Sequence, residues 1–314
     1  MPRLIKSLKN FKNMKKNIIL QGDSLSILKT FPNESVNCVI TSPPYWALRD
    51  YGVEGQLGLE PTFQEYINKL CDVFDEIKRV LKKDGTCFVN IGDTYASGGG
   101  KASEQSWVRK NGGTQQHPDN PAKSKLRGTM GKSLLQIPSR FAIEMSNRGW
   151  ILRNEIIWHK PNCMPSSAKD RFTIDFEKVF FFVKNKKYKF NQIKEKAIWG
   201  KDKRAGKGRL HYSNGKHKGE KGTGQENFVS IKQKRNMRSV WKISTTKFRG
   251  AHFATFPEAL VEPMILSGCS KNGVVLDPFF GAGTTGLVAK NNGRNYIGIE
   301  LNKEYINIAK KRLC

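Results

Sequence analysis

The last part of the chain, residues 257–314, places the tightest constraint on the fold. Its apolar pattern predicts helices that alternate with two short strands, Val274–Leu276 and Tyr296–Ile299. Strands that alternate with helices pair in parallel, and a parallel sheet must be covered on both faces. Two strands are too few to build such a core. We therefore expect them to join strands from the first half of the chain in one α/β sheet.

The first half contains patterns that suit this role. Thr62–Leu81 carries apolar residues at helical spacing, and Lys82–Gly85 supplies the cations and the glycine that end many helices. Short apolar runs on both sides of this helix predict buried strands. The expected strands are Asn17–Gln21, Val36–Ile40, Thr86–Ile91, Ile151–His159 and Glu177–Lys184.

A glycine-rich turn, DPFFGAGTTG at Asp277–Gly286, lies between a predicted strand and a predicted helix. Its G-x-G-x-x-G spacing, with Glu300 closing the next strand, is typical of a nucleotide crevice. There the ligand approaches the glycine backbone and the acid accepts hydrogen bonds from ribose hydroxyls. The spacing alone leaves NAD and other adenosine cofactors open. Asp277 favours a cationic ligand group, such as the ammonium of S-adenosylmethionine, over a pyrophosphate.

A second motif, TSPPYW at Thr41–Trp46, ends the predicted strand Val36–Ile40. The two prolines lack N–H groups and fix φ, so strand pairing stops and the backbone is stiff. A rigid carbonyl beside a hydroxyl and an aromatic ring suits a flat ligand with an exocyclic amino group. A nucleobase turned out of its helix is such a ligand. We assign Trp46 to the core rather than to this site.

The charge points to a polyanionic partner. The 314 residues carry 55 Lys and Arg against 27 Asp and Glu, a formal charge of +28. Nucleic acid is the obvious partner, although a lysine-rich composition could also inflate this number. Lys184–Arg238 holds eighteen Lys and Arg against four acids, with aromatic residues interspersed. This segment suits nucleic-acid contact, the alternative being a solvated, partly disordered insertion.

Other classes are disfavoured. The six cysteines show no C-x-x-C spacing, so we expect neither a zinc site nor a disulfide framework, and no metal. No apolar run approaches membrane-spanning length, and the basic N-terminus lacks the apolar core of a secretion signal. We therefore expect a cytoplasmic, nucleoid-associated protein.

TSPPYW followed by DPFFGAGTTG resembles the amino-type DNA methyltransferases of the β arrangement, in which the catalytic motif precedes the cofactor motif. Matching stretches are QGDS (Gln21–Ser24), NIGDTY (Asn90–Tyr95), RNEIIWHKPN (Arg153–Asn162) and HFATFPEALVEP (His252–Pro263). The resemblance implies a Rossmann-like, mostly parallel seven-strand sheet with circularly permuted motif order. It also implies S-adenosylmethionine as methyl donor.

The resemblance implies three parts of the chain. Residues 1–183 would be the catalytic half, with a DNA-facing loop at 97–132. Residues 184–240 would be the target-recognition insertion, and residues 241–314 the cofactor-binding half. It also implies double-stranded DNA as the partner, and allows a cognate restriction endonuclease and a homodimer.

The same resemblance assigns site residues. Ser42, Pro43, Pro44 and Tyr45 would form the base pocket. Glu300 would hold the ribose, and Asp23 would accept from the adenine amino group. The residues expected near the methionine part of the cofactor are Asp277, Phe279, Gly281, Gly283, Thr284, Phe253 and Thr255.

We expect methyl transfer to the exocyclic N4 of cytosine, because a serine at the position of Ser42 usually accompanies that product in the family that the chain resembles. Adenine N6 on the same scaffold is the nearest alternative. RNA as substrate, an NAD-dependent dehydrogenase and a non-enzymatic DNA-binding protein are further alternatives. No cysteine follows a proline, so the nucleophilic Pro-Cys of C5-cytosine methyltransferases is absent.

Overall fold

A computed structural model describes residues 15–96, 130–196, 234–246 and 256–314. Among them, eight strands form one sheet. Their order is β1 (Ile18–Gln21), β10 (Asn295–Glu300), β9 (Val274–Asp277), β2 (Val36–Thr41), β3 (Leu81–Ile91), β5 (Phe176–Val183), β4 (Ile151–His159) and β8 (Val240–Lys242). The helices are α2 (Ser24–Leu28), α3 (Phe63–Val80), α7 (Ile137–Asn147), α8 (Glu258–Gly268), α9 (Thr284–Asn291) and α10 (Lys303–Leu313).

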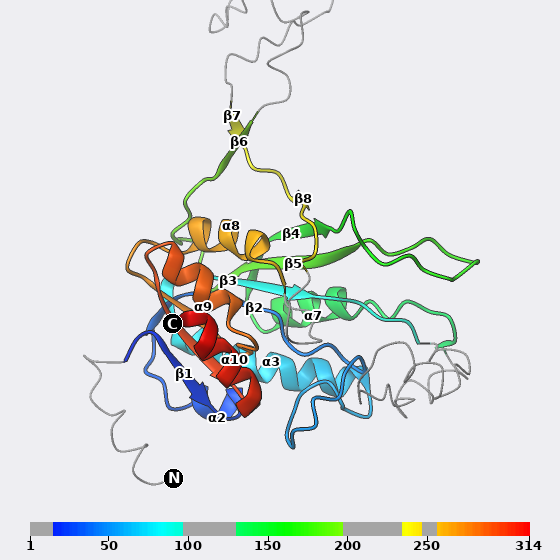
Figure 1. Ribbon diagram of the computed structural model, residues 1–314, viewed down its shortest axis with the longest axis horizontal. Helices are drawn as coiled ribbons and strands as arrows, with labels where there is room; N and C mark the ends of the chain where they lie inside the picture. The colour runs from blue at the N-terminus through cyan, green and yellow to red at the C-terminus, as the bar shows by residue number, and fades with distance from the viewer. Residues whose placement is uncertain (1–14, 97–129, 197–233, 247–255) are drawn as a thin grey trace, which may run out of the picture. The chain divides into compact units, whose positions relative to one another are not determined.

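The two ends of the sequence build one sheet, which confirms the prediction made from the C-terminal strands. Strand β10 pairs in parallel with β1, where Ile297 lies opposite Ile18. Strand β9 pairs in parallel with β2, where Val275 lies opposite Cys38. Figure 1 shows the orange and red C-terminal elements beside the blue N-terminal ones. The chain therefore closes its sheet with segments that are far apart in the sequence.

Side chains alternate across the sheet and enter two apolar layers, as the period of a strand requires. On β3, Cys87 and Val89 belong to the core that α3 and α7 cover. Phe88, between them, points to the opposite face, where it lies against Gly268 of α8 and stacks on Phe181 of β5. Helices thus cover both faces, as a largely parallel sheet needs.

In the described part of the chain, the sheet has eight strands rather than the expected seven. Strand β5 is antiparallel to both β3 and β4, and the short strand β8 adds an eighth member by pairing in parallel with β4. Ile157 lies opposite Val240 in that pair. The added strand brings the residues that follow Lys242 to the end of β4.

One expected boundary is wrong. Helix α3 ends at Val80, and β3 begins at Leu81 rather than at Thr86. Lys82–Gly85 therefore lies within the strand, where the register against β2 shifts between Val36 and Cys38. A Cβ on Gly85 would lie 2.6 Å from a Leu81 methyl carbon and 2.9 Å from a backbone oxygen of β2. This glycine allows close strand packing and does not cap the helix.

The chain divides into two compact units, one holding residues 1–191 and 239–314, the other Gln192–Arg238. The second unit contains the antiparallel pair β6 (Lys194–Lys196) and β7 (Lys234–Asn236). Within this pair Glu195 accepts hydrogen bonds from Arg235 at 2.7 Å and from Arg238 at 3.0 Å. Among the described residues, no helix combines the length and the apolar character needed to cross a bilayer.

Candidate active site

One cavity of about 430 Å³ lies where the two ends of the sequence meet. Ser42 follows β2, Pro278 follows β9 and Glu300 ends β10, so the cavity opens at the carboxyl ends of parallel strands. Ligands of open α/β sheets bind in this position. The sequence-predicted residues that line it are Asp23, Ser42, Pro43, Pro44, Tyr45, Phe279, Gly281, Thr284 and Glu300.

The turn after β9 has a conformation that its glycines permit. Gly281 has a φ of 51° and Gly283 a φ of 80°, both in the left-handed region. Gly283 caps the N-terminus of α9, and a Cβ there would lie 2.9 Å from that of Ala309 in α10. Gly281 and Thr284 line the cavity, whereas Gly283 serves the packing of the turn.

Glu300 lies beside this turn and presents a carboxylate to the cavity. Its two carboxylate oxygens accept backbone N–H groups, from Gly281 at 2.7 Å and from Asn302 at 2.8 Å. Burial raises the pKa of this carboxyl, and the hydrogen bonds act against that rise. Each oxygen retains a second lone pair. The side chain is therefore fixed in place and can still accept hydrogen bonds from a ligand in the cavity.

Asp23 reaches the same cavity from the N-terminal end of the chain. It caps α2, with its Oδ1 accepting the Ser26 N–H at 2.8 Å. The next residue, Ser24, donates its hydroxyl to the Pro278 carbonyl at 2.5 Å. This bond holds the start of α2 against the turn after β9. Asp23 and the glycine turn therefore lie on one wall of the cavity.

Asp277 is placed differently from the expectation. It is 1% exposed and does not line the cavity. Its carboxylate accepts the hydroxyls of Thr41 at 2.6 Å and Thr285 at 2.7 Å, and the Phe279 N–H at 3.1 Å. Burial raises its pKa to about 6. The carboxylate ties β2, β9 and α9 together beneath the cavity, and the expected contact with a cofactor ammonium is not supported.

Two other expected residues, Phe253 and Thr255, lie outside the described part of the chain. Their neighbour Phe256 does line the cavity. Tyr51 and Tyr305 line it as well, with their rings edge to face at 6.1 Å. The cavity thus offers aromatic side chains beside acidic acceptors, a combination that suits a heteroaromatic ring joined to a ribose.

The SPPY residues form the second wall. The Tyr66 hydroxyl donates to the Pro44 carbonyl at 2.8 Å, which holds the proline pair against α3. A Cβ on Gly92 would lie 2.6 Å from the Tyr45 ring, so this glycine lets the ring sit close to the backbone after β3. Trp46 points away into the core and is 1% exposed, as expected.

Three polar residues that the sequence analysis did not assign complete this wall, namely Asn90, Lys160 and Glu177. Glu177 Oε2 accepts the Tyr45 hydroxyl at 2.7 Å and the Asn90 amide at 3.0 Å. Its other oxygen pairs with the Lys160 ammonium. In the sequence, these residues are marked only by their positions near the ends of three strands. Polar residues at such positions occur in many sheets, so position alone does not identify a functional residue.

Comparisons with known proteins show the family of the chain. The family model described as DNA methylase matches residues 36–311. The chain is 42% identical over 299 residues to the Type II methyltransferase M.Cfr9I of Citrobacter freundii, covering 94% of this chain and 87% of that one. It is 39% identical over 303 residues to the Type II methyltransferase M.SmaI of Serratia marcescens, covering 96% and 92%.

Solved structures share the fold. The PvuII DNA methyltransferase, titled cytosine-N4-specific, aligns with a TM-score of 0.63 at 22% identity and covers 96% of this chain and 88% of its own. The putative DNA modification methylase TTHA0409 of Thermus thermophilus, solved in complex with S-adenosyl-L-methionine, aligns with a TM-score of 0.56 at 22% identity and covers 94% and 93%. The chain belongs to the DNA methylase family, whose methyl donor is S-adenosylmethionine.

Proposed function

We propose that this protein methylates the exocyclic N4 of cytosine in double-stranded DNA, with the target base turned out of the helix. One observation carries the proposal. The Ser42 hydroxyl and the Pro43–Pro44 backbone line the same cavity as the glycine turn and Glu300. A base at the first group and a methyl donor at the second would meet inside one cavity.

The cofactor wall suits S-adenosylmethionine, which supplies an electrophilic methyl group on its sulfonium sulfur. Glu300 has lone pairs free for the ribose hydroxyls, and Asp23 has a carboxylate oxygen available for the adenine amino group. Phe279 and Thr284 would lie along the methionine part. These contacts fix the donor relative to the strand ends that also carry the base pocket.

The base wall answers the main chemical difficulty of the reaction. The N4 lone pair of cytosine is delocalised into the ring, so this nitrogen is a poor nucleophile. Hydrogen bonds from its two protons to the Ser42 hydroxyl oxygen and the Pro43 carbonyl would localise the lone pair towards the methyl group. Because Pro44 has no N–H and a fixed φ, the Pro43 carbonyl is held without strand pairing. Alignment of two reactants in this way accounts for much of an enzyme's acceleration.

Tyr45 would stack on the extruded base. Its ring packs against the backbone at Gly92, and its hydroxyl donates a hydrogen bond to Glu177. Stacking of a base on an aromatic side chain is worth roughly 1–3 kcal/mol, which offsets part of the cost of turning the base out. The proton released from N4 after methyl transfer leaves the enzyme for solvent.

Two observations favour cytosine N4 over adenine N6. The residue before the proline pair is Ser42, and the PvuII enzyme, which is named as cytosine-N4-specific, shares the fold. Incubation of the protein with duplex DNA and S-adenosylmethionine, followed by nucleoside mass spectrometry, tests the assignment. N4-methylcytosine is the expected product. N6-methyladenine as the only modified nucleoside would overturn it, and methylation of RNA but not of duplex DNA would overturn the substrate.

The basic segment at residues 184–240 is proposed to read the target sequence. Its high positive charge supports contact with the DNA backbone. The relatives named Type II methyltransferases support a restriction–modification role with a cognate endonuclease. A homodimer remains a prediction, which sedimentation of the free protein would test.

A further inference from the structure

We propose that Glu177 is a positioning residue that acts through Tyr45 to make the Ser42 oxygen a hydrogen-bond acceptor for the target amino group. The inference rests on the proposed function and adds a specific part to it. Three side chains form a series of hydrogen bonds along the cavity wall: Glu177 is bonded to Tyr45, and Tyr45 is bonded to Ser42.

The series has a fixed direction at the glutamate. A carboxylate has only lone pairs, so the 2.7 Å bond between Glu177 Oε2 and the Tyr45 hydroxyl must be donated by the tyrosine. The pKa of Tyr45 is raised well above its ordinary value by burial and by the nearby Glu177 charge, which keeps the phenol protonated and able to donate. The single Tyr45 hydroxyl proton is thereby directed towards Glu177, with Asn90 Oδ1 as a second acceptor at 3.3 Å, and away from Ser42.

The direction of the Tyr45–Glu177 hydrogen bond also fixes the direction of the hydrogen bond between Ser42 and Tyr45. Because Tyr45 has no second proton, its oxygen can only accept from Ser42, whose Oγ lies 3.4 Å away. Ser42 then donates its proton to Tyr45 and leaves its lone pairs for the cavity that it lines. A free serine hydroxyl could instead point its proton at the amino nitrogen. It would then engage the lone pair that has to attack the methyl group.

The orientation of the glutamate side chain is itself fixed by its neighbours. Lys160 pairs with Oε1, and Asn90 donates to Oε2 at 3.0 Å. The side chains of Lys160 and Glu177 are each only 18% exposed. Lys160 also lies over the Trp158 ring at 4.6 Å, and Trp158 is paired across the sheet with Glu177. Donors therefore surround the carboxylate on both oxygens.

This surrounding makes Glu177→Gln an informative variant. Lys160 requires an acceptor at the first oxygen position, so the amide oxygen should face Lys160 and the amide N–H groups should face Tyr45. Tyr45 would then accept from Gln, and its own proton would be free for Ser42 or for Asn90 Oδ1, so Ser42 would no longer be held as the donor to Tyr45. Glu177→Gln is thus expected to remove the fixed direction of the series rather than merely weaken one bond.

The experiment is a double-mutant cycle of Tyr45→Phe and Glu177→Gln. Its readout is the single-turnover rate of methyl transfer at saturating S-adenosylmethionine and duplex DNA. Each single variant is expected to be about tenfold slower, the rate equivalent of about 1.4 kcal/mol for one lost hydrogen bond. The double variant should be no slower than Tyr45→Phe, because the phenol hydroxyl through which Glu177 acts is already absent from that variant. Affinities for DNA and cofactor should be unchanged.

Glu155→Gln is the matched control. Glu155 lies on the neighbouring strand β4, pairs with Lys178 at 2.7 Å and does not line the cavity. Its loss removes a carboxylate–lysine pair of the same kind, and a rate within twofold of the unaltered protein is expected. If Glu177→Gln does not fold, Glu177→Asp replaces it in the cycle with the same expectation of non-additivity.

The outcomes separate this inference from the proposed function. N4-methylcytosine from the unaltered protein, together with effects that multiply to about a hundredfold in the double variant, would overturn the role of Glu177. A product other than N4-methylcytosine would overturn the proposed function. The cycle would still report whether Glu177 acts through Tyr45 on the amino group that is modified.

Discussion

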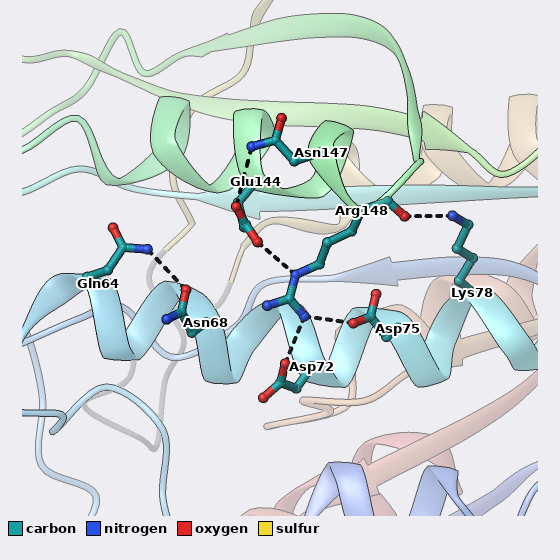
Figure 2. A network of polar contacts seen from close by, with 8 residues as sticks. All are labelled: Gln64, Asn68, Asp72, Asp75, Lys78, Glu144, Asn147 and Arg148. Atoms are coloured by element: carbon teal, nitrogen blue, oxygen red, sulfur yellow. Dashed lines mark hydrogen bonds and ion pairs between the residues drawn. The ribbon is translucent and has the colours of Figure 1, made fainter.

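Two clusters of charged and polar side chains in this molecule differ in what they leave unsatisfied. Arg148, at the end of α7, bonds to Asp72 and Asp75 of α3 at 2.7 Å and to Glu144 of its own helix at 2.9 Å (Figure 2). Lys78 donates to the Arg148 backbone carbonyl at 2.8 Å. These contacts, here called the Arg148 cluster, join two helices that cover one face of the sheet.

The cavity cluster of Glu177, Lys160, Asn90, Tyr45 and Ser42 has a different pattern. In the Arg148 cluster the carboxylates are about a third to a half exposed and face one guanidinium. In the cavity the two charged side chains are largely buried, and the series of hydrogen bonds ends at Ser42, which lines the cavity. The Arg148 cluster uses its hydrogen-bonding groups within the protein, whereas the cavity cluster presents Ser42 to a ligand. This difference separates a cluster that stabilises the fold from one that can bind a substrate.

Replacement of Ser42 by alanine should have the largest effect on catalysis. It removes the acceptor at the open end of the cavity cluster while the fold and the stacking ring remain. Loss of one preorganised hydrogen-bonding group at a reacting centre typically costs on the order of a hundredfold in rate. Single-turnover methylation measures it. Ser146→Ala, in a helix away from the cavity, is the control, and equal rates for the two variants would contradict the assignment.

Gly92→Ala should have the next largest effect. The new methyl group would lie 2.6 Å from the Tyr45 ring, which must move away from the backbone and carry its hydroxyl from Glu177. We expect methyl transfer to fall about tenfold, because the ring and the series shift together. Titration with S-adenosylmethionine should show unchanged affinity. An unchanged rate would mean that the ring position is not critical.

The buried carboxyl of Asp277, which joins β2, β9 and α9, should make the unfolding free energy depend on pH. Its pKa is raised to about 6 in the folded state, against 3.8 when unperturbed. The folded state therefore retains a proton that the unfolded chain has lost, so stability falls as pH rises from about 4 to about 6. Relative to Asp277→Asn, the unaltered protein should lose about 2 kcal/mol of unfolding free energy between pH 4 and pH 7. Denaturant unfolding at both values measures this, and a pH-independent difference would contradict it.

Arg148→Ala should have the smallest effect on activity. Its partners are partly exposed, so the loss in unfolding free energy should be about 1 kcal/mol. The rate of methyl transfer should not change, since no member of the Arg148 cluster lines the cavity. Thermal unfolding and the single-turnover rate measure the two quantities. A tenfold loss of rate would remove the distinction drawn between the two clusters.

The sequence was sufficient for the order of elements and for their closure into one sheet. Apolar periodicity located the helices and strands, and the need to cover two C-terminal strands linked the ends of the chain. It failed at Lys82–Gly85, because a glycine after a helix resembles a cap when the partner strand is not visible. The eighth strand was not expected, because three residues at Val240–Lys242 carry too little pattern.

At the site, the sequence identified residues whose local motif is unusual, such as the proline pair and the glycine turn. It could not separate Asp277, which turns inward, from Glu300, which faces the cavity, because both end a strand. Glu177 and Lys160 were missed because their meaning depends on the antiparallel pairing of β4 and β5. Such contacts become visible only when the pairing and the register of the strands are known.

The most direct test of the central claim is a structure of the protein with S-adenosylhomocysteine and a duplex that contains its target sequence. We predict a cytosine turned out of the helix and stacked on Tyr45, with N4 within hydrogen-bond distance of Ser42 Oγ and the Pro43 carbonyl. The cofactor sulfur should lie on the opposite side of that nitrogen, with the ribose at Glu300. A target base that remains stacked in the duplex, or a cofactor bound outside this cavity, would contradict the account.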